Sequence, residues 1–245
     1  MEDRTEKRFY ELADRAWNRG IVCCTDFLDG AAQAVLHRIR TELPPVPLIL
    51  FGGAEGCERK MAGFGAETPE DLPIACLRVT PVSAAFSEDL QHRDVLGALM
   101  SLGFERELLG DIVLRGREAY VFCVGRIAPY IAEQLTEIRR TAVRVQTAPQ
   151  LPEGELFRTE RLVIQVASQR LDALAAHAFH MSRGNAQTLF PAGRVFLDGA
   201  VCTAPDVCPQ TGQIVSVRGF GRFRYLGASG RSKKGKWNTV IEMYV

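Results

Sequence analysis

The sequence lacks any apolar run of the roughly 20 residues that a membrane-spanning helix needs. Its longest candidate, Val46 to Phe51, has only the length of a strand. No apolar segment follows the charged start Met1 to Arg4, so the sequence offers no secretory signal. These absences predict a protein of the cytoplasm that has no membrane anchor.

The seven cysteines lack a pattern, because their number is odd and no C-x-x-C pair occurs. Disulfide frameworks and zinc tetrads both depend on such patterns. We therefore expect free thiols in a reducing compartment and no bound metal. The thiols concerned are those of Cys23, Cys24, Cys57, Cys76, Cys123, Cys202 and Cys208.

What the sequence does have is a strong charge asymmetry that the overall net charge of +1 conceals. Residues 161–245 hold 11 Lys and Arg against 4 Asp and Glu, a net charge of +7. Residues 1–160 hold 19 against 25, a net charge of −6. A basic domain on an acidic body is typical of a protein that binds a polyanion.

Residues 1–73 predict an N-terminal helical and mixed region. A second helix is expected to begin at the capping pair Thr25-Asp26 and to end near Leu43, before Pro44-Pro45. The run Val46 to Phe51 then predicts a short buried strand. Before this second helix, the spacing of Phe9, Leu12, Ala13 and Trp17 predicts a first helix with one apolar face.

Residues 74–150 predict the order β-α-β-β-α-β, the split arrangement of ferredoxin-like and RRM-like domains. A hairpin turn at Arg115 to Glu118 joins the middle strands, and Pro149 to Glu155 predicts a polar linker after the last one. The segments are Ile74–Thr80, Asp89–Leu102, Ile112–Leu114, Tyr120–Val124, Ile127–Ile138 and Ala142–Thr147.

Two features of these regions resemble binding sites. Tyr120 and Phe122 share one strand face, as an RNA-stacking platform would, but Ile74 to Val79 offers no aromatic partner, so we expect core packing instead. Gly52-Gly53-x-x-Gly56 follows a strand, as phosphate loops do, yet lacks the Gly-Lys-Ser/Thr of a P-loop. It predicts a glycine-rich turn that can contact RNA.

Residues 161–245 predict a strand, two short helices and a β-ribbon. Arg170-Leu171-Asp172 opens the first helix, and Ser182 is placed to cap the second. Arg183 and Gln187 are four residues apart and so share a helical face. A turn at Asp198-Gly199 precedes the returning strand.

The pattern R-L-D…S-R-x-x-A-x-x-L…G-x-V…D-G…G-x-I-V-x-V, over Arg170 to Val217, resembles the S4 domain, an RNA-binding module. The resemblance implies that the second helix and the adjoining ribbon clasp structured RNA. It gives RNA-facing roles to Ser182, Arg183 and Gln187, and to Arg170 a role in positioning or in contacting the backbone. A capped Arg183 can make a bidentate contact to a phosphate or a base edge.

The resemblance extends over nearly the whole chain, to the YlmH-type S4 proteins. It implies an N-terminal region, a central RRM-like domain and a C-terminal S4 domain at 1–73, 74–150 and 161–245. It also implies binding to the large ribosomal subunit and rescue of stalled, split ribosomes that carry peptidyl-tRNA. In the segment Phe51–Lys60, Ala54 stands where the family usually has an aromatic residue. The segments that carry this resemblance are Phe51–Lys60, Leu102–Asp111, Arg218–Phe223 and Ser232–Lys236.

The basic tail has Phe220, Phe223 and Tyr225 interleaved with its cations. Exposed aromatics can stack on unpaired bases, whereas a solvated hairpin with buried aromatics is the alternative. Glycines around the lysines predict mobile point charges. The full set of expected RNA-binding residues is Arg170, Ser182, Arg183, Gln187, Arg194, Arg218, Arg222, Arg224, Arg231, Lys233, Lys234 and Lys236.

The main alternative is an RNA-modifying enzyme, since S4 domains also occur on pseudouridine synthases and methyltransferases. A synthase needs a motif such as H-R-L-D-x-x-T-S-G, whereas Arg170-Leu171-Asp172 is followed by Ala-Leu-Ala. Residues 1–150 show no repeating unit of the doubly wound sheet that a methyltransferase needs. We predict a non-catalytic binder of structured RNA that has no cofactor and is monomeric when free. A division-related scaffold is a third reading.

Overall fold

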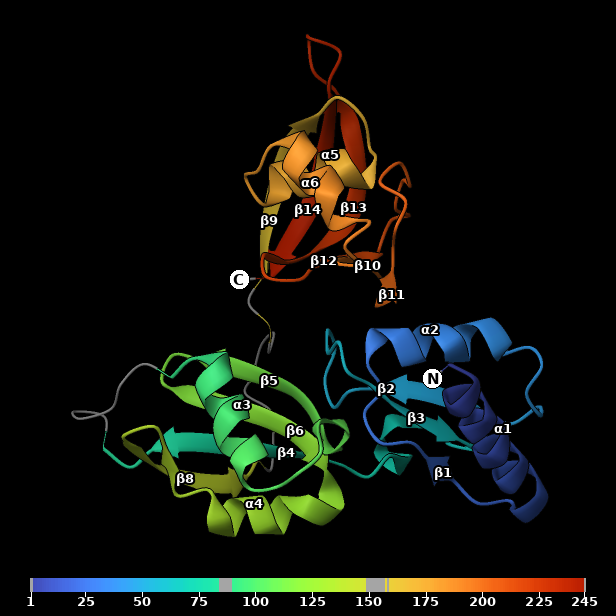
Figure 1. Cartoon of the computed structure of the whole chain (residues 1–245), viewed down its shortest axis with the longest axis vertical. Coiled ribbons are helices and arrows are strands. Elements are labelled where there is room, and N and C mark those ends of the chain that lie inside the picture. Colours follow the sequence, from blue (N-terminus) through green and yellow to red (C-terminus); the bar gives the residue numbers. More distant parts are fainter. Residues whose placement is uncertain (1, 84–89, 149–156, 158, 245) are drawn as a thin grey trace. The chain divides into compact units, whose positions relative to one another are not determined.

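The computed structural model describes residues 2–83, 90–148, 157 and 159–244. In them the fold is α+β, as predicted, with six α-helices and three sheets whose strand pairs are all antiparallel. The chain divides into two compact units, Met1–Leu156 and Phe157–Val245, here called the N-terminal and C-terminal units (Figure 1). The predicted linker, Pro149–Glu155, lies outside the described residues.

The N-terminal unit begins with a three-stranded sheet, of order β1-β3-β2, and two helices that pack together with it. Phe9 and Leu12 of the first helix and Leu36 of the second join Phe64 of the sheet in one hydrophobic core. The elements are α1 (Glu2–Arg19), β1 (Cys23–Cys24), α2 (Gly30–Ile39), β2 (Leu48–Phe51) and β3 (Met61–Phe64).

The predicted apolar face of α1 was wrong at one position. Trp17 is 56% exposed, whereas Ala16 is 4% exposed and packs with Phe9 and Leu12. The reason is geometric. Ala16 follows Phe9 by seven residues, close to two full turns, while the eighth residue lies a further 100° around the helix.

The predicted start and end of the second helix were also wrong. Its cap is Asp29, whose carboxylate accepts the backbone N–H of Ala32 at 2.9 Å. Thr25 instead is buried and accepts the backbone N–H of Ala62 at 2.9 Å, which links the chain after β1 to β3. The helix ends at Ile39 rather than near Leu43.

The second part of the N-terminal unit has the predicted β-α-β-β-α-β order, with one added strand. Its sheet has the strand order β5-β6-β4-β8-β7, and α3 and α4 pack into the core on one face of it (Figure 1). The elements are β4 (Ile74–Pro81), α3 (His92–Ser101), β5 (Leu109–Arg115), β6 (Glu118–Val124), α4 (Ala128–Gln134), β7 (Glu137–Ile138) and β8 (Thr141–Thr147).

Both helices of this part are shorter than predicted. α3 begins at His92, and Asp89, where we expected the start, lies outside the described residues. α4 ends at Gln134, because the chain turns there into β7, where Glu137 pairs with Ala142 of β8.

The C-terminal unit is a six-stranded sheet of order β11-β10-β12-β13-β14-β9, with both helices on one face. Leu171, Leu174 and Phe190 of the helical segment pack on Val215 and Phe223 of the sheet. The elements are β9 (Thr159–Val166), α5 (Leu171–Ala178), α6 (Arg183–Leu189), β10 (Val195–Leu197), β11 (Ala200–Val201), β12 (Ile214–Val217), β13 (Gly221–Arg231) and β14 (Trp237–Tyr244).

The basic tail belongs to this sheet. β13 continues to Arg231, with register shifts after Tyr225 and after Ala228, and β14 returns beside it and also pairs with β9. All seven cysteines are free, as expected. Over the part of the chain that the structure describes, no helix is long and apolar enough to cross a bilayer.

Candidate nucleic-acid interface

Four of the predicted RNA-binding residues gather where α6 begins. The Ser182 hydroxyl caps this helix by accepting the backbone N–H of Asn185 at 3.1 Å, as predicted. Arg183 and Gln187 then project from one helical face toward α5. Both meet the carboxylate of Asp172, and Arg170 approaches it from the start of α5. We call Arg170, Asp172, Arg183 and Gln187 the Asp172 cluster.

In the Asp172 cluster, three side chains surround one carboxylate. Arg183 donates from Nε at 3.0 Å and from Nη2 at 3.2 Å, one bond to each carboxylate oxygen. Gln187 Nε2 donates to Oδ2 at 2.8 Å, and Arg170 Nε lies 3.4 Å from Oδ1. The Asp172 side chain is 0% exposed, so these groups replace its hydration shell.

The cluster holds Asp172 in its charged form. Burial alone would raise the pKa of this carboxyl, but the hydrogen bonds from Arg183 and Gln187 and the charges of Arg183 and Arg170 outweigh it, and the pKa lies below its ordinary value. The side chains of Arg170 and Arg183 remain 38% and 48% exposed. Two cations against one carboxylate leave a net positive charge fixed at this surface.

The structure limits which edge of Arg183 can meet RNA. The sequence predicted that its guanidinium makes a bidentate contact to a phosphate or a base edge. In the structure the Nε and Nη2 edge is already bidentate to Asp172. While that pair holds, only the remaining part of the half-exposed guanidinium can face a ligand.

Arg218 lies in the turn between β12 and β13, and Arg194, directly before β10, lies beside it. Their backbones are joined by the Arg218 N–H, which donates to the Arg194 carbonyl at 2.9 Å. Arg194 Nη2 donates back to the Arg218 carbonyl at 2.7 Å, and its guanidinium lies 5.7 Å from the centre of the Phe220 ring. The Arg218 guanidinium lies 5.3 Å from the centre of the Phe196 ring.

Arg222 and Arg224 lie on the sheet face opposite the helices. They alternate along β13 with Phe223 and Tyr225, which are 0% and 3% exposed and belong to the core. The Arg222 guanidinium lies 4.2 Å from the centre of the Tyr244 ring. The tail thus fits the alternative of a basic hairpin with buried aromatics at these two positions.

The tip of the hairpin carries the remaining cations. Lys233, Lys234 and Lys236 are exposed in the turn between β13 and β14. The backbone N–H of Ser232 donates to the Lys236 carbonyl at 2.7 Å and that of Lys236 to the Ser232 hydroxyl at 3.1 Å, which closes this turn. The Arg231 guanidinium lies 4.2 Å from the centre of the Trp237 ring.

The predicted set is therefore divided among four places. The structure brings Arg170, Ser182, Arg183 and Gln187 together and puts the other eight at the β12–β13 turn, on the open sheet face and at the hairpin tip. The sequence pattern indicated Asp172 only as one of the residues that begin the first helix of this unit. The facing pair Arg183 and Gln187 was the signal that could have indicated a shared partner on the preceding helix.

In the N-terminal unit, the two aromatics that resembled a stacking platform are buried. Tyr120 is 5% and Phe122 is 1% exposed, which confirms the preference for packing. The glycine-rich turn covers part of this face. A Cβ at Gly53, whose φ is +100°, would lie 2.3 Å from Phe122 Cδ1, so only glycine brings the backbone this close.

The end of that turn is clasped to β5. The backbone N–H groups of Glu58 and Arg59 donate to the Asp111 carboxylate at 2.5 and 3.1 Å. The Arg59 side chain donates to the carbonyls of Leu109 at 3.0 Å and Phe27 at 2.7 Å. Two segments that carried the family resemblance, Phe51–Lys60 and Leu102–Asp111, thus bind each other within the protein.

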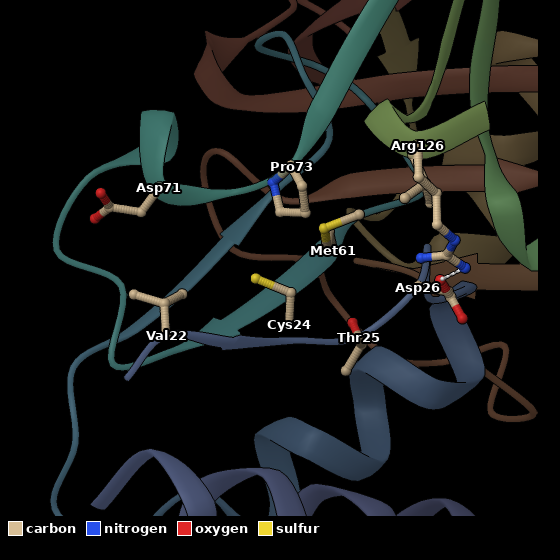
Figure 2. Close-up of a pocket in the computed structure, with 9 residues that line it drawn as sticks. Val22, Cys24, Thr25, Asp26, Met61, Asp71, Pro73 and Arg126 are labelled. Carbon is tan, nitrogen blue, oxygen red and sulfur yellow. Dashed lines mark hydrogen bonds and ion pairs between the residues drawn. The ribbon is translucent and has the colours of Figure 1, made fainter. Parts of the chain in front are cut away.

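A pocket of about 400 Å³ opens beside β1 in the same unit (Figure 2). Asp26 and Arg126 form an ion pair at 3.1 Å at one end of it. Hydrogen bonds from the backbone of Thr68 and Glu67 lower the pKa of Asp71, and burial raises the pKa of the Cys24 thiol. A neutral thiol beside carboxylates already bonded within the protein is poorly suited to nucleophilic or acid–base chemistry.

Comparisons with known proteins agree with the predicted family. The family model described as "Putative RNA-binding domain in YlmH" matches residues 69–151. The chain is similar to the ribosome-associated protein quality control protein P2 of Bacillus subtilis (strain 168), with 33% identity over 226 residues, 89% of this chain and 86% of that protein. The solved structure of the cell division protein ylmH from Streptococcus pneumoniae covers 61% of this chain and 92% of its own, with 20% identity and a TM-score of 0.48. Identity at the level of the Bacillus subtilis relative, over nearly the full length of both proteins, shows that the chain belongs to the YlmH family.

Proposed function

We propose that the chain is a non-catalytic protein of the cytoplasm that binds structured ribosomal or transfer RNA on the large ribosomal subunit. Its role would lie in the quality control of stalled peptidyl-tRNA. The name of the Bacillus subtilis relative supports the ribosomal context, and the family model supports RNA as the ligand. We assign RNA binding to the C-terminal unit, which would be an S4 domain. Residues 74–150 would form an RRM-like domain.

The observation that carries the proposal is the fixed positive charge at the start of α6. Arg170 and Arg183 are held by a buried carboxylate and still present about half of their surface to solvent. A cation that is already oriented loses little side-chain entropy when it meets a phosphate. The exposed Ser182 and Gln187 frame these cations on the same surface. Such an arrangement fits the regular spacing of phosphates in a folded RNA better than a flexible lysine does.

The other cations would add strength without selectivity. Arg194 and Arg218 at the β12–β13 turn and the lysines of the hairpin tip supply positive potential around the Asp172 cluster. Each phosphate that a cation neutralises contributes about −0.7 to −0.9 to the slope of log K against log salt. RNA binding should therefore weaken steeply as salt rises.

The test is co-sedimentation of the full chain with purified large subunits that carry peptidyl-tRNA, at low and at high salt. We expect the protein in the subunit fractions at low salt and its release at high salt. Crosslinking in cells, followed by sequencing of the attached RNA, would identify the contact. A protein that stays at the top of the gradient at low salt would refute the proposal.

A further inference from the structure

Phe220 differs from the other aromatic residues of the C-terminal unit. It is 48% exposed, whereas Phe223 and Tyr225 on the following strand are buried. Among the described residues of Phe157–Val245, it is the one aromatic side chain in the exposed class. A single exposed hydrophobic side chain is common on protein surfaces, so what distinguishes Phe220 is how its ring is supported and which groups lie beside it.

The Phe220 ring is held in place from below. It lies 6.2 Å from the Phe179 ring at an interplanar angle of 48°, and Phe179 lies 5.9 Å from the core residue Phe223 at 50°. These tilted contacts form a short aromatic ladder from the core to the surface. The exposed ring is therefore a supported platform rather than a loose side chain.

The residues on either side of Phe220 keep it accessible. Gly219 has φ +88°, and a Cβ there would lie 2.8 Å from Arg194 Nη2. Gly221 has φ +127°, in the region that favours glycine. The turn thus has no side chain next to the ring along the chain, and the space at Gly219 is taken by the guanidinium of Arg194.

One oriented cation lies over the ring. The Arg194 guanidinium lies over it at 5.7 Å and is fixed by its hydrogen bond to the Arg218 carbonyl. The exposed Arg218 precedes Phe220 by two residues in the same turn, and its guanidinium lies over the Phe196 ring. An aromatic surface beside an oriented cation matches the chemistry of a nucleotide, which joins a flat π system to a negative phosphate.

We propose that Phe220 and Arg194 form a stacking site for one unpaired nucleobase, with Arg218 placed for an adjacent phosphate. The inference rests on the proposed RNA-binding function and narrows its ligand. In a continuous duplex each base face is covered by its neighbours, so Phe220 has nothing to stack on. The preferred RNA therefore carries a loop, a bulge or a frayed end beside the helix that the Asp172 cluster grips.

The experiment compares two RNAs that share one stem, a stem–loop with 2-aminopurine in the loop and the fully paired duplex. The full chain is used as wild type, as Phe220→Leu and as Phe220→Trp. Stacking contributes ~1–3 kcal/mol per base, so Phe220→Leu should weaken stem–loop binding by about 5- to 150-fold. Duplex affinity and the salt slope should not change, because no charge is removed. Phe220→Trp should retain binding.

The fluorescence of 2-aminopurine reports stacking directly. Its quenching on binding should be present in the wild type and in Phe220→Trp and absent in Phe220→Leu. Tyr130→Leu is the matched control, because Tyr130 is an equally exposed ring, at 49%, in the N-terminal unit. This variant should bind both RNAs as the wild type does.

The outcomes separate the two proposals. If the wild type binds neither RNA, the proposed function fails. If it binds both, and Phe220→Leu equals it on both with quenching intact, RNA binding stands and the stacking site is refuted. If Phe220→Leu weakened binding to the duplex and to the stem–loop equally, the stacking site would also be refuted, since the ring would then not bind an unpaired base.

Discussion

The two units use arginine in opposite ways. In the N-terminal unit, Arg59 bonds to two backbone carbonyls, and Arg126 pairs with the carboxylate of Asp26. In the C-terminal unit, guanidinium groups lie over aromatic rings, as Arg222 does over Tyr244 and Arg231 over Trp237. A ring orients a guanidinium without neutralising it, whereas a carboxylate does both. The first use ties layers of one protein together, and the second keeps oriented charge available for a partner.

Arginine also meets carboxylates in the C-terminal unit, at Glu242 and in the Asp172 cluster, and loss of the fully buried Asp172 should have the largest effect. Asp172→Asn removes the charge that Arg183 and Arg170 meet, so we expect the fragment 157–245 to lose about 2–3 kcal/mol of unfolding free energy. Urea unfolding followed by circular dichroism measures this. Asp206→Asn, at an exposed acid of the same unit, is the control and should stay within about 0.5 kcal/mol. An unchanged midpoint for Asp172→Asn would show that the cluster is not structural.

The pH dependence of that loss follows from the lowered pKa of Asp172. A carboxyl whose pKa is lower in the folded state stabilises the fold above its unfolded value, about 3.9. The contribution is lost as the pH falls through that value toward the folded pKa. The difference between wild type and Asp172→Asn should therefore be full near neutral pH and should shrink in acid. If wild type and Asp172→Asn differed by the same unfolding free energy near neutral pH and in acid, the lowered pKa of Asp172 would be contradicted.

In the N-terminal unit, Arg59 is the arginine whose side chain stabilises the fold. Arg59→Ala leaves the Phe27 carbonyl without its side-chain donor and removes one of two arginine donors to the Leu109 carbonyl, so we expect that unit to lose about 1–2 kcal/mol of unfolding free energy. RNA affinity of the full chain should not change, because this guanidinium serves the fold. Arg15→Ala removes an exposed cation from α1 and is the control. A loss of RNA affinity with Arg59→Ala alone would break the comparison between the units.

Separating the units tests the comparison itself. We expect residues 157–245 alone to bind structured RNA, and residues 1–156 to bind it more weakly by about tenfold or more, ~1.4 kcal/mol. The opposite net charges, −6 for residues 1–160 and +7 for residues 161–245, give the reason. Filter binding at one salt concentration measures both fragments. Equal affinities would place RNA contacts on both units.

The hairpin tip is expected to set the salt dependence of binding and not its selectivity. Replacement of Lys233, Lys234 and Lys236 with Ala should flatten the slope of log K against log salt by about 2, for all RNAs alike. Salt titrations with the stem–loop and with the duplex measure this. If the triple variant instead abolished the preference for one RNA, recognition would lie at the tip rather than at α6.

Local signals were predictable from the sequence, and partnerships between distant elements were not. The Ser182 cap and the hairpin at Arg115–Glu118 follow from short patterns, and both are present. Thr25-Asp26 and Asp29 are equally good caps on paper, and pairing of β1 with β3 decides between them. Nor does the spacing of Phe220 and Phe223 tell which is buried until the start of β13 is known.

The contact of Gly53 with Phe122 restricts how this sequence can vary. Any side chain at position 53 would need the space of the phenyl ring, so positions 53 and 122 should change together among relatives, small against large. A substitution at position 53 alone would lift the turn from the sheet and uncover Phe122. The burial of Phe122, which is 1% exposed, thus depends in part on the absence of a single methyl group at position 53.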